Sequence, residues 1–187
     1  MSIIIAFVGL PGSGKTEASK VLEEIGFARV RFGDVTDEEL KKRGLEVNEE
    51  NEKRIREELR RIHGMDAFAK LNEPRINRFL EEGKDVVIDG LRSFDEFLYL
   101  KSKYNGRLKV IAIFTPPAIK YERMIKREVR GLSSIEECKK RDIAELRNLD
   151  MGGSIAMADE TIINDGSLED LKNKVLSLVK KYKENNL

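Results

Sequence analysis

The strongest constraint on the fold of this 187-residue chain is the stretch "GLPGSGKT" at residues 9–16, which has the spacing G-x-x-x-x-G-K-[ST]. The apolar run "IIIAFV" at 3–8 precedes it, and such a β-branched run is typical of a strand buried on both faces. The segment "KTEASKVLEEIG" follows, with apolar residues at helical spacing and a glycine where a helix would end. A strand, a glycine-rich loop and a helix in this order predict a phosphate-binding loop.

The loop supplies the groups that a nucleoside triphosphate requires. Its glycines let backbone N–H groups approach phosphate oxygens closely, and the positive end of the following helix adds to the attraction. Lys15 is expected to reach the β- and γ-phosphates, and the Thr16 hydroxyl is expected to ligate Mg²⁺. The residues predicted to bind the nucleotide phosphates are Gly9, Leu10, Pro11, Gly12, Ser13, Gly14, Lys15 and Thr16.

Apolar segments further along the chain alternate with charged segments of helical periodicity. This alternation predicts a three-layer α/β fold, in which a five-stranded parallel sheet carries helices on both faces. Ligands of such a sheet bind at the carboxyl ends of its strands. We expect a single domain over residues 1–187, with a helical region over about 35–82 that is broken at Gly44, Gly64 and Pro74. The expected strands are 3–8, 28–32, 85–90, 108–114 and 160–164.

Composition excludes several classes of function. Charged residues make up 37% of the chain but balance to a net charge of +1, so no overall basic field favours nucleic acid or acidic lipid. No apolar run approaches the length of a membrane span. The single cysteine, Cys138, excludes a disulfide framework and suits a reducing cytoplasm. The sequence leaves the oligomeric state open.

Two aspartates are expected at the carboxyl edge of the sheet. Asp89 ends the strand in "VVIDGLRS", where a carboxylate could hold Mg²⁺ beside the phosphate loop, although a turn or cap role is the alternative. Asp34 follows the strand 28–32 and could orient or deprotonate an acceptor hydroxyl, or help to hold Mg²⁺. A helix N-cap is an equally good interpretation of Asp34. Arg92 and Arg43 face the same edge and could bind an acceptor phosphate.

Three arginines precede the small-residue segment "RGLSS". Arg123, Arg127 and Arg130 are spaced i, i+4 and i+7, which would place them on one face of a helix predicted over 118–130. Such a cationic stripe could be a solvated surface. We instead favour a lid over about 123–145 that closes its arginines onto the phosphate being transferred.

The motifs that occur in the chain beside the phosphate loop indicate whether the γ-phosphate is passed to water or to a second substrate. The chain has no N-K-x-D base-reading motif, and no D-x-x-G switch follows the third strand, so a GTPase is not indicated. An arginine lid and a long helical insert suit an enzyme that encloses two substrates, and the sequence predicts a small-molecule kinase. The alternatives are an ATP-hydrolysing switch or assembly factor on a kinase scaffold, and a nucleotide-binding module without turnover.

At these residues the sequence resembles the nucleoside monophosphate kinases. "GLPGSGKT" with "VVIDGLRS" is similar to adenylate kinase, which carries an Asp-Gly-x-Pro-Arg stretch, and this implies that Arg92 contacts the acceptor phosphate. "FGDVTDEELKKRG" is similar to the acceptor-binding entry of that enzyme and implies a phosphate-binding role for Arg43. The resemblance also favours ATP over GTP.

The C-terminal third resembles dephospho-coenzyme A kinase. "ADETIINDGSLEDL" is close to a segment that lies against the adenine in that family, which implies that Asn164, Asp165 and Gly166 border the base. The same resemblance places Asp34 on a general base. Taken whole, the chain resembles a group of archaeal P-loop nucleotide-kinase-like proteins related to both families. A nucleotide-like acceptor is therefore expected, with dephospho-coenzyme A as the leading alternative.

Overall fold

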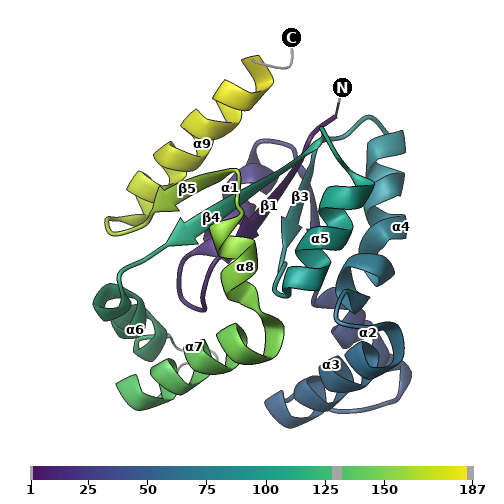
Figure 1. Ribbon diagram of the computed structural model, residues 1–187, viewed down its shortest axis with the longest axis vertical. Coiled ribbons are helices and arrows are strands. Elements are labelled where there is room, and N and C mark those ends of the chain that lie inside the picture. Colours follow the sequence, from purple (N-terminus) through teal and green to yellow (C-terminus); the bar gives the residue numbers. More distant parts are fainter. Residues whose placement is uncertain (1, 128–131, 185–187) are drawn as a thin grey trace.

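Five parallel strands form one sheet in the computed structural model, which describes residues 2–127 and 132–184 (Figure 1). The order across the sheet is β2-β3-β1-β4-β5, so the predicted five-stranded parallel sheet is confirmed. The strands are β1 (Ile4–Val8), β2 (Ala28–Arg31), β3 (Val86–Asp89), β4 (Leu108–Phe114) and β5 (Glu160–Ile163).

The central position of β1 explains its unbroken apolar sequence. Ile4 pairs with Val86 of β3 on one side and with Leu108 of β4 on the other. All five residues of β1 are buried, because side chains that alternate between the two faces of a covered sheet meet a hydrophobic core on each. Ile4, Ala6 and Val8 belong to one core, and Ile5 and Phe7 belong to the other.

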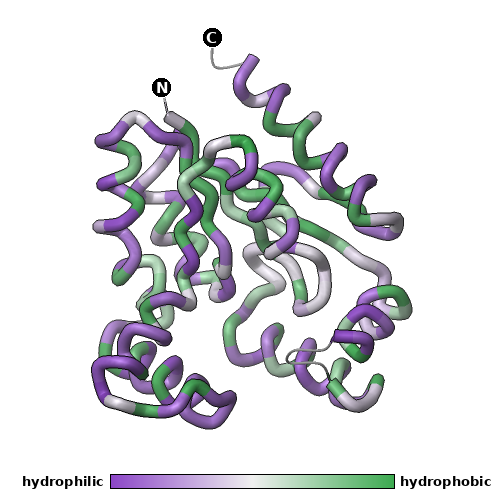
Figure 2. The backbone as a smooth tube through the Cα atoms, turned by 180° about the vertical axis from the view of Figure 1, so that it is seen from behind, coloured by the Kyte–Doolittle hydropathy of each residue, from purple (hydrophilic) through white to green (hydrophobic). Residues whose placement is uncertain are grey.

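Helices cover both faces of the sheet. On one face, α1 (Lys15–Glu24) and α9 (Leu168–Glu184) bury Leu22 and Val175 against the strands. The other face is covered by α4 (Ala67–Glu81) and α5 (Phe94–Lys103), with Ile76 and Phe97 among the buried residues. Figure 2 shows hydrophobic residues concentrated along the strands and hydrophilic residues along much of the outer helices. The core on this second face also receives residues from α2 (Asp34–Lys42), α3 (Glu49–His63) and α8 (Met151–Ala156).

Two further helices, α6 (Pro117–Ile125) and α7 (Ile135–Leu149), lie beyond the carboxyl ends of the strands, opposite α2 and α3 (Figure 1). A buried ion pair between Lys120 and Asp142 joins them, and the Tyr121 hydroxyl donates to the same carboxylate at 2.9 Å. This ion pair keeps the two helices together, because separating them would leave the charges of Lys120 and Asp142 without a partner.

The predicted helix over 118–130 is wrong in its last part. Helix α6 ends at Ile125, and Lys126 closes it by donating its N–H to the carbonyl of Glu122. Arg123 and Arg127 therefore do not share one helical face. Arg130 lies outside the described residues.

The sequence did not predict α8, and it predicted a break at Pro74 that does not occur. Helix α8 contains two adjacent glycines, which are poor helix formers, and Gly153 packs so closely on the Phe94 ring that an added Cβ would lie 2.8 Å from it. Helix α4 runs through Pro74, which is exposed together with Lys70. The Lys70 carbonyl that loses its partner can therefore bond to water, while the opposite face of the helix stays packed on the core.

Among residues 2–127 and 132–184, no helix combines the length and the apolar character that crossing a membrane requires.

Replacing Pro74 with alanine should stabilise the protein. A proline inside an exposed helix costs up to about 3 kcal/mol relative to alanine, so Pro74→Ala should raise the free energy of unfolding by about 1–3 kcal/mol. Urea denaturation followed by circular dichroism measures this change. Lys70→Ala on the same exposed face serves as the control and should change stability by less than about 0.5 kcal/mol. A loss of stability in Pro74→Ala would contradict this explanation of the uninterrupted helix.

Candidate active site

The phosphate loop connects β1 to α1 and is held in a shape that only glycine tolerates at three positions. Gly9, Gly12 and Gly14 have φ angles of 146°, 82° and 104°. A Cβ on Gly9 would lie 2.4 Å from the carbonyl oxygen of Ile113 on β4, and one on Gly12 would lie 2.6 Å from the Cγ atom of Met124 on α6. The close approach of the neighbouring elements therefore requires the glycines that the motif contains.

The segment after β5 fixes the loop from a third side. The Asn164 side-chain amide donates to the Ser13 carbonyl at 2.8 Å, and the Thr115 hydroxyl donates to the same oxygen at 3.0 Å. Asn164 is buried, and its backbone N–H donates to the Phe114 carbonyl at 2.7 Å. One of the predicted base-side residues is thus placed directly against the phosphate loop.

Arg123 binds this same segment. Its guanidinium donates to the carbonyls of Asn164 at 3.1 Å and Gly166 at 2.6 Å. Asp165 is exposed and lies 3.6 Å from the ammonium of Lys174 on α9. Arg123 therefore connects α6 to the predicted base-side loop, and its charge is directed at backbone oxygens.

Lys15 lies over the loop. Its ammonium donates to the carbonyls of Gly9 at 2.6 Å and Leu10 at 3.0 Å. Burial, followed by the positive charge of Arg92, lowers the pKa of this ammonium to about 7, and the exposed Arg127 contributes to the same shift. Lys15 is half-buried above a left-handed glycine backbone, and no carboxylate in residues 2–127 or 132–184 bonds to it. These residues therefore fit the phosphates of a nucleotide.

Asp89 and Thr16 meet beside the loop, as predicted for a magnesium site. The Thr16 hydroxyl lies 3.4 Å from Oδ1 of Asp89, while Arg29 of β2 donates to Oδ2 at 2.6 Å. In the described part of the chain, no three histidine, cysteine or acidic side chains cluster as a metal site. Thr16 and Asp89 would therefore hold Mg²⁺ together with oxygens of phosphate and water, which is the usual mode for this ion.

An inner cavity of about 300 Å³ opens next to this pair. Among its lining residues are Thr16, Asp89 and Arg92, which the sequence predicted. Asp34 is not among them: its carboxylate lies 3.0 Å from Arg31, and partial burial raises its pKa. Asp37, one turn further along α2, does line the cavity. The sequence offered a signal for Asp37, since three residues after Asp34 lies on nearly the same helical face.

Arg43 lies away from this cavity. Its guanidinium contacts Glu39 at 2.7 Å and Glu58 at 2.9 Å, so two carboxylates already balance its charge. Arg56 and Arg60 of α3 line the cavity instead. Sequence reasoning missed both, because α3 carries many charged residues and only its packing shows which of them point inward.

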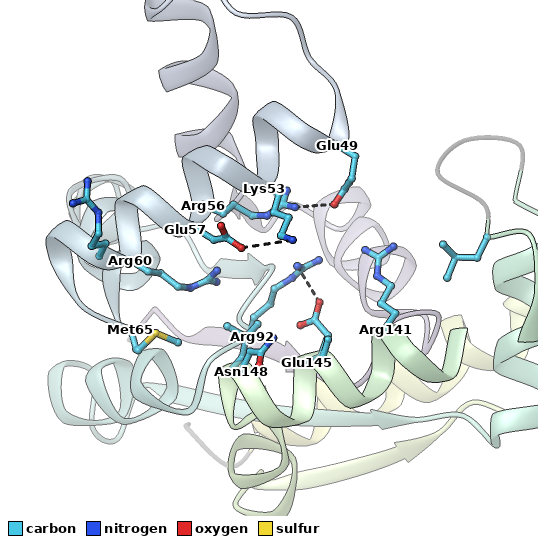
Figure 3. A pocket seen from close by; sticks show the side chains of 14 residues that line it. Glu49, Lys53, Arg56, Glu57, Arg60, Met65, Arg92, Arg141, Glu145 and Asn148 are labelled. Atoms are coloured by element: carbon cyan, nitrogen blue, oxygen red, sulfur yellow. Dashed lines mark hydrogen bonds and ion pairs between the residues drawn. The ribbon is translucent and has the colours of Figure 1, made fainter. Parts of the chain in front are cut away.

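An outer cavity of about 820 Å³ continues from the inner one, between α3 and α7 (Figure 3). The two cavities share Arg56, Arg60 and Arg92. Arg92 spans the space and approaches Glu145 of α7 at 3.2 Å. Residues from the predicted acceptor region and from the predicted lid thus line one continuous space.

Comparison with known proteins identifies the family. A UPF0200 protein from Thermococcus gammatolerans is 39% identical over 184 residues, which cover 96% of this chain and 95% of that protein. The chain belongs to the UPF0200 family. A family profile described as an AAA domain also matches residues 5–142. The predicted resemblance to archaeal P-loop proteins is confirmed.

Solved structures with the same fold include small-molecule kinases. A dephospho-CoA kinase from Campylobacter jejuni aligns over the full length of both chains with a TM-score of 0.64 and 16% identity. A shikimate kinase from Acinetobacter baumannii, in complex with shikimate, aligns over 98% of this chain and 96% of that one, with a TM-score of 0.59 and 21% identity. At these identities the comparison establishes that this UPF0200 protein has the P-loop kinase fold.

Nucleotide binding should take up a proton at alkaline pH. Above pH 7 the Lys15 amine of the free protein is mostly neutral, and the negative phosphates of a bound nucleotide favour its charged form. ADP binding at pH 8.5 should therefore take up close to one proton per site, and binding at pH 6 should take up much less. Calorimetry in buffers with different ionisation enthalpies measures the uptake, with Lys15→Met as control. Equal uptake by Lys15→Met at pH 8.5 would exclude Lys15 as the group that titrates.

Proposed function

We propose that this UPF0200 protein is a cytoplasmic, ATP- and Mg²⁺-dependent kinase that transfers the γ-phosphate to a small, nucleotide-like acceptor. The observation that carries the proposal is the inner cavity, which the phosphate-loop residue Thr16 lines on one side and the acceptor-side residues Asp37 and Arg60 line on the other. A hydrolase needs room only for water, whereas a kinase needs a second binding site beside the first. The reduced, buried Cys138 fits a cytoplasmic enzyme.

On the nucleotide side, the loop from Gly9 to Thr16 would bind the phosphates through its N–H groups, and the segment from Asn164 to Gly166 would border the base. Lys15, Arg127 and Arg130 would balance the charge that develops on the transferred group. Arg123 would act on the same reaction by holding the base-side segment through its two carbonyl contacts.

The metal has a defined place in this proposal. Mg²⁺ held by Thr16 and Asp89 would neutralise the negative charge of the β- and γ-phosphates. The chain itself contributes the orientation of Asp89, because Arg29 fixes one of its carboxylate oxygens.

On the acceptor side, we assign the helical region 35–82 to acceptor binding and the segment 123–145 to a lid. Arg92 lies where it could bind the acceptor, since it faces both cavities. Asp34 or Asp37 would accept the proton of an acceptor hydroxyl. Arg43 would contribute only if it released Glu39 and Glu58.

Dephospho-coenzyme A kinase is the second candidate of the same class. It is supported by the full-length structural likeness to the Campylobacter jejuni enzyme and by the Asn164 segment packed against the phosphate loop. An ATPase switch or assembly factor would use the same loop without a small acceptor.

The deciding experiment is transfer of label from γ-labelled ATP. Purified protein with Mg²⁺ is incubated with nucleoside monophosphates, dephospho-coenzyme A, shikimate or no acceptor, and Lys15→Ala serves as the blank. We expect one acceptor to be labelled at least about tenfold faster than phosphate is released, because a kinase excludes water from the transfer site. Release of phosphate at one rate with every acceptor would refute the kinase and favour the switch.

The proton acceptor can be identified by comparing two substitutions. If Asp37 is the base, Asp37→Asn should lower kcat by about 100-fold or more, while Asp34→Asn should lower it by less than about tenfold. Both variants keep the size of the side chain. The opposite order would assign the base to Asp34 and would mean that α2 turns when the acceptor binds.

A further inference from the structure

The outer cavity has an excess of positive charge. Six cationic side chains and three carboxylates line it, in a chain whose net charge is only +1. Figure 3 shows Lys53, Arg92 and Arg141 pointing toward a common space from α3, from the segment after β3 and from α7. The cations are Lys53, Arg56, Arg60, Arg61, Arg92 and Arg141, and the acids are Glu49, Glu57 and Glu145.

The three carboxylates of this cavity already have partners. Glu49 lies 2.9 Å from Arg56, Glu57 lies 3.9 Å from Lys53, and Glu145 lies 3.2 Å from Arg92. Arg141 forms no ion pair or hydrogen bond with any residue in 2–127 or 132–184, although it is half-buried. Positive charge therefore remains available on the α7 side.

Arg60 of α3 supplies a further guanidinium to the wall that the two cavities share. Its guanidinium stacks on the Phe68 ring at 4.9 Å and lies 3.9 Å from the carboxylate of Glu96 beneath the cavity. Its side chain is only 13% exposed, and its Nε atom has no hydrogen-bond partner within the described chain. A guanidinium with unused donors at a cavity wall suits an anionic ligand.

The inner cavity differs in its charge balance. Arg31 faces Asp34 and Asp37 at 3.0 and 3.9 Å, and Arg56 also contacts Glu52 at 3.1 Å. Cations and carboxylates are nearly equal in number along its wall. Available positive charge thus increases from the transfer point beside Thr16 toward the outer cavity.

We propose that the outer cavity binds a phosphate group of the acceptor that is separate from the oxygen receiving the γ-phosphate. This inference rests on the proposed kinase function and names its substrate class, a phosphorylated alcohol. The acceptor hydroxyl lies in the inner cavity, and Arg141 binds the phosphate of the acceptor in the outer one. In the transfer, the hydroxyl proton passes to an α2 carboxylate. The hydroxyl oxygen bonds to the γ-phosphorus, and the bond from that phosphorus to the β–γ bridging oxygen breaks, which releases ADP.

Inorganic phosphate tests the outer cavity without a known acceptor. With the nucleotide site saturated by a non-hydrolysable ATP analogue, phosphate binding is measured by calorimetry. We expect saturable binding that Arg141→Gln weakens by about tenfold or more, as for the loss of a charge-assisted hydrogen bond. The control Arg54→Gln lies exposed on α3, lines neither cavity and should leave binding unchanged. No saturable binding, or equal binding by Arg141→Gln and wild type, would overturn the phosphate site.

The product of the labelling experiment tests the acceptor oxygen. Phosphorus NMR should show a new phosphate monoester. A new P–O–P anhydride, as formed on a nucleoside monophosphate, would overturn the inference while the kinase function stands. If no acceptor is labelled but phosphate binding depends on Arg141, the kinase function fails and the anion site stands. The two failures are therefore distinguishable.

Discussion

The packing of the Gly9 backbone against the β4 carbonyl of Ile113 is the constraint on which the site depends. That contact follows from the parallel pairing of β1 with β4, which brings the end of β1 beside the end of β4. The same pairing carries Thr115 to the Ser13 carbonyl, and β5 adds Asn164 to it. The sheet therefore holds the loop in place through these contacts, and such preorganisation lowers the cost of binding a ligand.

A second group of interactions organises the acceptor side around a buried carboxylate. Glu96 is fully buried at the start of α5, where it accepts the backbone N–H groups of Arg92 and Ser93 in a capping box. Burial raises the pKa of Glu96 to about 7, and the nearby Arg60 opposes the shift. One acidic side chain thus positions both the segment that carries Arg92 and the guanidinium of Arg60.

The strands and the phosphate loop could be predicted from the sequence because their signals are local. Strands β1, β3 and β4 correspond to apolar runs, β2 and β5 to short segments that contain apolar residues, and the glycine spacing with Lys15 and Thr16 is contained in eight residues. The start of α9 depends on equally local contacts, since the side chains of Ser167 and Asp170 accept each other's backbone N–H groups.

The acceptor side could not be predicted in the same way, because its charges are selected by tertiary packing. Arg43 and Arg60 look alike in sequence, yet one is held by two glutamates and the other points into a cavity. The pairing of Arg29 with Asp89 depends on β2 lying next to β3, which no local pattern reveals. The end of α6 at Ile125 likewise could not be predicted from the spacing of the arginines alone.

The pairing of Arg29 with Asp89 has a consequence for ion selectivity. Arg29 binds one carboxylate oxygen of Asp89 at 2.6 Å, so the oxygen that faces Thr16 is the better placed of the two to ligate a metal. A small ion that keeps most of its water and takes single carboxylate oxygens, such as Mg²⁺, can use such a site. Ca²⁺ binds more oxygens and often takes both oxygens of one carboxylate. Asp89 could offer both of its oxygens only if its ion pair with Arg29 were broken. At the proposed metal site, this strand-to-strand contact would favour Mg²⁺ over Ca²⁺, because it limits the number of carboxylate oxygens that Asp89 can give to an ion.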